Sequence, residues 1–249
     1  MKRELINYIG KTDSTNSLLK KIINYKAQNN SQLPELFTIF AGGQTSGRGL
    51  GKNKWESEEG QNLLCSMYFR PKISPNRQFA FNQCFALAVR NTIAHYVNNV
   101  CIKWPNDIYV GEKKIAGILI EHLICGESIQ YTIAGVGINV NQKIFPKDIP
   151  NPISLANITA KTYDIREVLE NLLTECDFFY KKLTDSNLGE INSEYLSHLY
   201  KLNEFSTYKI FGKIQEAKII GVNTYGQLMV EDSANNLIEC NLKEISFVV

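Results

Sequence analysis

The sequence predicts an α+β fold, in which helices pack on a mixed, largely antiparallel sheet and a small β-barrel module follows. Residues 102–121 contain two strand-like runs around a short turn, and residues 130–140 form a third run. The apolar run 79–97 has the length and composition of a central buried helix. From about Asn203, short β-type runs alternate with turn signals, as in a small antiparallel module.

Length and composition describe an ordinary globular protein. The chain has 249 residues, of which 44% are hydrophobic and 21% charged, enough for one large domain or a domain with a small module. A net charge of +2 is too small to predict a nucleic-acid or membrane-surface protein. The six cysteines form no C-x-x-C pair, which predicts reduced, buried thiols. Without an apolar leader or membrane span, we expect a cytoplasmic protein.

The N-terminal part predicts a strand around 5–9 and then a helix that ends near Ala27. Residues 13–16 read Asp-Ser-Thr-Asn, and all four are residue types that cap helices. A cap needs one or two of them, so we expect others to face a ligand. A second short strand, 36–41, leads directly into a glycine-rich stretch.

The middle of the chain supplies the rest of the predicted sheet. A strand at 63–69 precedes the buried helix, and the hairpin and third strand follow. Gly135, Gly137 and Asn139 share one face of that third strand, because side chains alternate along a strand. Paired glycines on one face indicate that a flat ligand, another backbone or a helix packs there.

The chain beyond residue 140 predicts helices and then the β module. We expect a short helix within 151–161, a long helix from Asp164 and a further helix that ends near Tyr200. The change from helical patterns to short β-type runs after this helix predicts two domains, 1–203 and 204–249.

Residues 42–55 form a glycine-rich basic loop. They hold five of the 16 glycines, together with Arg48, Lys52 and Lys54, and no acidic residue. Glycine lets backbone amides approach an anion, and Arg and Lys supply the charge that suits a phosphate. A mobile surface loop is the alternative interpretation. Neither a P-loop nor a dinucleotide fingerprint fits, because Arg48 stands where the P-loop has lysine and Lys52 where the fingerprint has its last glycine.

A second group of charged residues surrounds the predicted hairpin. Lys103-Trp-Pro-Asn-Asp107 is followed seven residues later by Lys114. A tight turn at Pro105 explains part of the motif. Lysines beside an apolar strand need a partner, and a bound phosphate is one that fits.

Five motifs, taken together, resemble those of biotin protein ligase, also called biotin–[acetyl-CoA-carboxylase] ligase. They occur in the family's order: Asp13-Ser-Thr-Asn16, Gln44-Thr-Ser-Gly-Arg-Gly49 with Trp55, Lys103-Trp-Pro-Asn-Asp107, Lys114-Ile-Ala-Gly-Ile-Leu-Ile-Glu121 and Gly135-Val-Gly-Ile-Asn139. The resemblance implies a class II synthetase-like catalytic domain, which binds biotin and ATP, and an SH3-like C-terminal barrel. It implies a ligase with biotin and ATP as substrates and Mg²⁺ as cofactor. Such an enzyme makes biotinyl-5′-AMP and transfers biotin to a lysine of a biotin carboxyl carrier protein or carboxylase carrier domain.

Matching the motifs residue by residue implies the roles. Lys114 resembles the lysine that contacts both the biotin carboxylate and the α-phosphate, and it is our first choice for catalysis. Arg48 lies in the loop that folds over the acyl-adenylate. Asp107 orients Mg²⁺ or Lys114, or assists deprotonation of the acceptor lysine, and the sequence leaves these three roles open. The expected biotin contacts are Ser14, Thr15, Asn16, Gln44, Gly47, Arg48, Lys114, Gly117 and Gly137. The expected ATP contacts are Arg48, Lys54, Trp55, Lys103, Asn106 and Asn139.

The chain also departs from the family pattern. Leu50 and Gly51 stand where familiar members carry additional arginines, so the loop has less charge. Bifunctional members have an N-terminal helix-turn-helix domain, which we do not expect here, and hence we do not expect DNA as a partner. The small net charge and the lack of an apolar span predict no membrane partner. A homodimer through the edge of the central sheet and a monomer are equally compatible with the sequence. The alternatives are a lipoate or octanoate protein ligase or transferase of similar fold, and a non-catalytic biotin-binding protein.

Overall fold

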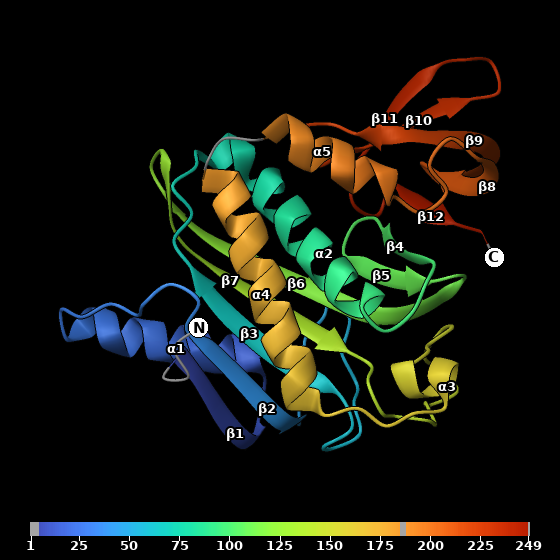
Figure 1. The fold of residues 1–249 in the computed structure, drawn as a ribbon. Helices are drawn as coiled ribbons and strands as arrows, with labels where there is room; N and C mark the ends of the chain where they lie inside the picture. Colours follow the sequence, from blue (N-terminus) through green and yellow to red (C-terminus); the bar gives the residue numbers. More distant parts are fainter. Residues whose placement is uncertain (1–4, 185–187, 249) are drawn as a thin grey trace.

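A seven-stranded mixed sheet forms the centre of the protein. The computed structural model describes residues 5–184 and 188–248, and the strand order in this sheet is β1-β2-β3-β7-β6-β5-β4 (Figure 1). The strands are β1 (Ile6–Thr12), β2 (Thr38–Gln44), β3 (Leu63–Phe69), β4 (Val100–Lys103), β5 (Asp107–Val110), β6 (Lys113–Cys125) and β7 (Ser128–Ile138). β1 and β2 are parallel and every other neighbouring pair is antiparallel, which confirms the predicted α+β class.

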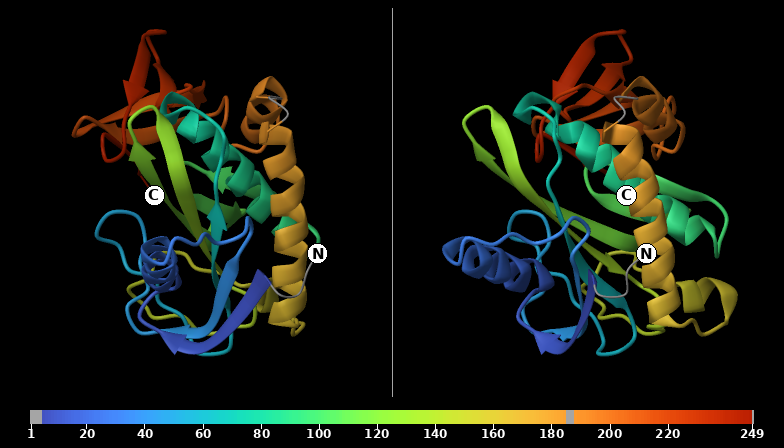
Figure 2. Two further views of the ribbon diagram at one scale, coloured as in Figure 1. Left: turned by 90° about the vertical axis from the view of Figure 1, so that its left-hand side faces the viewer. Right: turned by 60° about the vertical axis from the view of Figure 1, so that its left-hand side comes forward.

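Helices cover both faces of this sheet. The helices are α1 (Thr15–Gln28), α2 (Gln78–Ala94), α3 (Leu155–Thr159), α4 (Ile165–Thr184) and α5 (Leu188–Ser197). α2 and α4 lie side by side on one face, whereas α1 lies on the opposite face (Figure 2). Within the part of the chain that the structure describes, no helix is both long enough and apolar enough to span a membrane.

Each face of the sheet has its own apolar core. The alternation along β3 sends Cys65 and Met67 into the large core beneath α2 and α4, and Tyr68 into the small core beneath α1. β7 alternates likewise, so Ala134 and Val136 face the large core. The glycines between and after them therefore face α1, as the period of two predicts.

α2 ends earlier than its apolar pattern indicates. The apolar run continues to Val97, but the helix ends at Ala94. Val97 is nevertheless buried in the large core, so the last residues of the run are apolar because they are core residues and not because they are helical. Periodicity alone does not separate these two causes.

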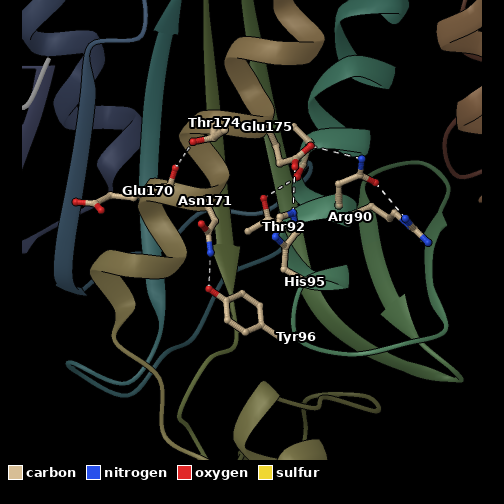
Figure 3. Close-up of polar contacts among 10 residues, drawn as sticks. Arg90, Thr92, His95, Tyr96, Glu170, Asn171, Thr174 and Glu175 are labelled. Carbon is tan, nitrogen blue, oxygen red and sulfur yellow. Dashed lines mark hydrogen bonds and ion pairs between the residues drawn. The ribbon is translucent and has the colours of Figure 1, made fainter. Parts of the chain in front are cut away.

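Polar contacts fasten α2 to α4 on the large-core side. His95 Nε2 lies 3.1 Å from Glu175 Oε1, and Asn171 Nδ2 donates to Tyr96 Oη over 2.7 Å (Figure 3). Both contacts join a residue directly after the end of α2 to a residue of α4. They lie across the sheet from the face of α1, and we assign them to helix packing.

The predicted strand 102–110 is in fact two strands, so the single strand was wrong, whereas the tight turn predicted at Pro105 is present. β4 ends at Lys103 and β5 begins at Asp107, and the two residues pair with each other across a tight turn. The turn contains a cis peptide bond between Trp104 and Pro105. Proline has no N–H to donate to a ladder, which favours a chain reversal here over a continuous strand. The turn places Lys103 and Asp107 together at the sheet edge.

The C-terminal module is a five-stranded antiparallel sheet with the order β11-β10-β9-β8-β12. Its strands are β8 (Phe205–Ile210), β9 (Lys213–Val222), β10 (Leu228–Asp232), β11 (Leu237–Cys240) and β12 (Ile245–Phe247). The predicted small β module is thereby confirmed, although β12 was not predicted. Among the described residues, no ladder joins β11 to β12. The module's buried side chains, such as Tyr208 and Leu228, belong to the same core as α2 and β3. The boundary between 203 and 204 stays a prediction.

Candidate functional site

A cleft of about 1050 Å³ lies on the α1 face of the sheet. Gly135 and Gly137 of β7 and Gly117 of β6 form its floor. It is lined by all of the residues that the sequence predicted except Gly47 and Asn139. The five separated motifs therefore meet in one place.

The start of α1 contributes a polar wall to the cleft. Ser14 occupies the N-cap position, but its side chain makes no capping hydrogen bond. Gln44 caps the helix instead, because its Oε1 accepts from Thr15 N over 2.7 Å and from Thr15 Oγ1 over 3.2 Å. Within the described chain, the Ser14 hydroxyl and Gln44 Nε2 have no protein partner, and both residues line the cleft. These two groups are the ones most available to a polar ligand.

Asn16 lies over the glycine floor with its amide fully engaged. Its Nδ2 donates to Leu119 O over 3.2 Å and to Glu121 Oε2 over 2.8 Å, and its Oδ1 accepts from Ser66 Oγ over 2.6 Å. A Cβ at position 135 would lie only 2.1 Å from Asn16 Oδ1, so this approach requires Gly135. The protein thus fixes Asn16, and its predicted biotin contact stays a prediction.

The glycine-rich loop contains a small hairpin, residues 47–55, which we call the loop hairpin. Gly49 N donates to Asn53 O over 2.8 Å, and Trp55 N donates to Gly47 O over 3.0 Å. Gly51 at its tip has a φ of +66°, which favours glycine. Gly47 lies outside the cleft lining, and a Cβ at this position would be 2.3 Å from Trp55 O, so the close packing requires glycine.

Trp55 covers much of the glycine floor. A Cβ at Gly137 would lie 2.4 Å from Trp55 Cε2, and one at Gly117 would lie 2.9 Å from Cζ3. The indole is therefore in direct contact with the backbone where the sequence predicted biotin. Its Nε1 is buried and has no hydrogen-bond partner among the described residues. A buried N–H of this kind is a ready donor to a ligand.

Two charged pairs and one enclosed lysine set the electrostatics of the site. Lys114 Nζ lies 2.7 Å from Asp107 Oδ1, and both side chains are about a quarter exposed, at 29% and 22%. The two atoms are close enough for an ion pair, but their geometry does not make a hydrogen bond. Arg48 pairs with Glu121 through two hydrogen bonds of 2.9 and 3.2 Å.

Lys103 is held by aromatic side chains. Its Nζ donates to Tyr109 Oη over 3.0 Å and lies 4.4 Å from the centroids of both the Tyr109 and Phe247 rings. Aromatic faces attract a cation, so these contacts hold Lys103 at one end of the cleft. Because Phe247 belongs to β12, the C-terminal module contributes directly to this end.

Comparison with known proteins places the chain in a family. The model of the biotin/lipoate A/B protein ligase family matches residues 8–139. The chain belongs to this family. The match covers all the cleft residues from Ser14 to Gly137, whereas Phe247 and the rest of the C-terminal module lie beyond it.

Individual relatives agree with the family match. The bifunctional ligase/repressor BirA of Bacillus subtilis is 28% identical over 208 residues, which are 81% of this chain and 63% of that protein. A biotin–[acetyl-CoA-carboxylase] ligase of Paracoccus denitrificans is 25% identical over 204 residues, or 79% of this chain and 81% of that one. A solved biotin protein ligase from Aquifex aeolicus, in complex with biotin and ATP, has a TM-score of 0.79 and 26% identity, with 98% of each chain covered. The chain thus spans less than two thirds of the Bacillus relative.

The donor set for a metal in this family member is small. Within residues 5–184 and 188–248, no three side chains of His, Cys, Asp or Glu gather into a metal-binding group. Asp107 is the predicted ligand, and it already pairs with Lys114. Mg²⁺ commonly takes one or two carboxylates and completes its shell with substrate oxygens and water, so a single aspartate fits such an ion.

Several residues in or directly behind the cleft of this family member were not predicted. Glu121 and Ser66 hold Asn16 from behind, and Lys243 and Phe247 come from the C-terminal module. A polar residue within the apolar strand 63–69 was a usable signal for Ser66. The module residues carried no such signal, because only tertiary packing brings them to the cleft.

Asn139 lies away from the cleft, although the sequence predicted an ATP contact for it. Its Nδ2 donates to Ile153 O over 3.0 Å, and its own N–H donates to Ile115 O over 2.8 Å. It therefore fastens the segment before α3 to the sheet.

Proposed function

We propose that this protein is an ATP-dependent biotin–protein ligase. It activates biotin as biotinyl-5′-AMP and transfers the biotinyl group to a lysine of a carboxylase carrier domain. The observation that carries the proposal is the meeting of the Lys114–Asp107 pair, the polar start of α1 and the basic loop hairpin over one glycine floor. Family membership and the likeness to a ligase solved with biotin and ATP support it.

The first step is adenylation. A carboxylate oxygen of biotin attacks the α-phosphorus of ATP, and the bond from that phosphorus to the bridging oxygen breaks to release pyrophosphate. The reaction develops negative charge on the α-phosphoryl oxygens, so it needs fixed cations more than a nucleophile from the protein. Lys114 supplies such a cation. Mg²⁺ beside Asp107 would neutralise phosphate charge.

The second step is acyl transfer. The carrier lysine, as a neutral amine, attacks the carbonyl carbon of the mixed anhydride, and AMP leaves with the electron pair of the broken carbon–oxygen bond. Asp107 lies near the reacting end of the cleft and is suited to accept the proton of the amine or to hold Lys114 in place. The anhydride hydrolyses readily, so the loop hairpin protects it by excluding water.

The polar groups of the cleft that have no hydrogen-bond partner within the described chain are suited to recognise the biotin head. The ureido ring offers both N–H donors and a carbonyl acceptor. The Ser14 hydroxyl can donate or accept, and Gln44 Nε2 can donate. Arg48, Lys54 and Lys103 also line the cleft, and their charge suits the phosphates of the nucleotide.

A transfer assay tests the proposal. The protein is incubated with Mg-ATP, biotin and a purified biotin carrier domain, with octanoate and lipoate in parallel reactions. We expect a biotin-dependent mass gain on the carrier. A gain with octanoate or lipoate alone would instead identify a ligase of the related class. Biotin binding without pyrophosphate release or transfer would identify a non-catalytic binding protein.

A further inference from the structure

Glu121 joins three segments of the site without reaching the cleft itself. Its Oε1 accepts from Arg48 Nη2 over 2.9 Å, and its Oε2 accepts from Arg48 Nη1 over 3.2 Å. The same Oε2 accepts from Asn16 Nδ2 over 2.8 Å. Among the described residues, Arg48 and Asn16 line the cleft and Glu121 does not. Any effect of Glu121 on a ligand therefore acts through these two residues.

We propose that Glu121 is a positioning residue, which latches the loop hairpin over the cleft through Arg48 and fixes Asn16 on the glycine floor. This inference rests on the proposed function for its effect on the reaction. The latch itself is a property of the protein without ligands, and it is measurable separately.

The latch joins a rigid element to an exposed one. Glu121 lies on β6, which pairs with β5 on one side and β7 on the other, so its backbone is fixed in the sheet. The loop hairpin is anchored differently, because its tip residues 51–54 are exposed. Its side chains contact the sheet through the Arg48–Glu121 pair and the indole of Trp55. The chain directly before it is held by backbone hydrogen bonds from Thr45 and Ser46 to Thr12 and Asp13, so loss of the pair frees the hairpin itself more than its base.

The geometry leaves Arg48 able to act on an anion while it is latched. A guanidinium carries five N–H donors, and Glu121 uses one on each terminal nitrogen. Three donors remain for a phosphoryl group. The two parallel hydrogen bonds also fix the plane of the guanidinium, which a single contact would not do. Glu121 thus sets both where the cation lies and how it faces.

The shared oxygen couples the two held residues. Oε2 accepts from both Arg48 and Asn16, so a change at Glu121 loosens the loop hairpin and the floor contact together. The position of the loop hairpin over an adenylate and the position of Asn16 on the glycine floor beneath it then depend on the same carboxylate. We expect the loss of Glu121 to let the adenylate escape or hydrolyse before transfer.

The first test uses the protein without ligands. Acrylamide quenching of tryptophan fluorescence reports mainly on Trp55, because the other tryptophan, Trp104, is only 5% exposed. Glu121→Gln keeps the shape of the side chain but removes its charge, and we expect greater quenching. Glu121→Asp keeps the charge on a shorter chain and should give an intermediate value. Glu231→Gln is the matched control, since Glu231 pairs with Lys218 at a similar exposure in the C-terminal module.

The second test measures how the adenylate is divided between transfer and loss. We expect Glu121→Gln to release about three to ten times more pyrophosphate per biotin transferred to the carrier, the scale of a lost partly exposed charged pair. Glu121→Asp should again be intermediate and Glu231→Gln unchanged. A quenching value and a ratio that stay at the native level in Glu121→Gln, or that change equally in Glu231→Gln, overturn the proposal. Greater quenching with an unchanged ratio overturns the role in the reaction. If the native protein transfers no biotin at all, the proposed function fails while quenching still decides the latch.

Discussion

Lys114 and Asp107 neutralise each other inside the cleft, 2.7 Å apart. They come from adjacent strands, β6 and β5, so the sheet fixes both backbones. Because the two side chains are only about a quarter exposed, their charges are less screened than those of a surface pair. In the proposed reaction, the α-phosphoryl group would compete with Asp107 for Lys114, and the ion pair would hold the cation in place until then.

Lys114→Ala should therefore abolish adenylation and leave the fold intact. Removing one fixed cation from a developing negative charge costs about a hundredfold or more in rate. The measurement is biotin-dependent pyrophosphate release, with circular dichroism as the check on folding. Lys113→Ala is the control, because Lys113 is the exposed neighbour and does not line the cleft. Nearly normal release in Lys114→Ala would remove Lys114 from its proposed role.

His122 lies on the other face of the sheet and links stability to pH. Its Nδ1 is 2.7 Å from Thr132 Oγ1, its Nε2 is 3.1 Å from Asn82 Oδ1, and burial lowers its pKa to about 4. Between pH 4 and an ordinary histidine pKa of about 6.5, the unfolded chain binds a proton that the folded protein does not. Stability contributed by neutral His122 is thus present above about pH 6.5 and is lost as the pH falls toward 4.

His122→Gln should flatten this pH dependence. The linked free energy is roughly 3 kcal/mol at most, since a shift of one pKa unit corresponds to about 1.4 kcal/mol. Urea unfolding at pH 7 and pH 4.5 gives the loss of free energy of unfolding for each protein, and we expect a smaller loss in the variant. Equal losses in both proteins would show that His122 titrates normally in the folded state.

At the scale of elements, the local sequence pattern predicted whether a segment is a helix or a strand better than it predicted where the segment begins and ends. The strand 63–69 was predicted with its observed bounds, because an apolar run there is bounded by polar residues and Pro71. A tight turn was predicted at Pro105, but residues 102–110 were still read as one arm of a hairpin, since an apolar pattern continues on both sides of the turn. β2 continues to Gln44, beyond the predicted end at 41, because its glycines stay in the ladder with β1.

The candidate site shows the same limit. The sequence predicted those site residues that belong to short motifs, and most of them line the cleft. Glu121 was inside a recognised motif but had no predicted role, because its partner Asn16 is 105 residues away. Its place on the Gly117 and Leu119 face of β6 follows from the period of two. What lies above that face is decided by tertiary packing, which one sequence does not show.

The glycine floor of β6 and β7 yields a test of where Trp55 lies. Gly137→Ala would place a Cβ 2.4 Å from Trp55 Cε2, so the indole and the loop hairpin must move away. We expect greater acrylamide quenching, with little loss of stability because the hairpin is exposed. Gly10→Ala in β1 is the control, since a Cβ there meets nothing within 4 Å. Equal quenching in both variants would place Trp55 away from the floor in solution.

At the scale of the whole molecule, the C-terminal module and the main sheet share a core and a cleft. Trp104 Nε1 donates to Gly226 O over 2.9 Å, and Phe79 of α2 packs against the same glycine. Lys103 reaches Phe247 from the other side. A boundary drawn in sequence at 203/204 therefore crosses a continuous packed region, from which we expect the two parts to unfold together.

Gly226→Ala tests this coupling, with Gly212→Ala as its matched control. Both glycines have a left-handed φ, +87° and +83°, so alanine strains both turns by about 1 kcal/mol. Only at Gly226 would the new Cβ also meet Phe79, 2.7 Å away, which adds about 1–3 kcal/mol of overpacking. We expect Gly226→Ala to lower the urea midpoint further, with circular dichroism and tryptophan fluorescence still giving one coincident transition. Equal midpoints in the two variants would show that the interface is not packed in solution. Two separated transitions would show that 1–203 and 204–249 fold independently, because a shared core does not come apart in halves.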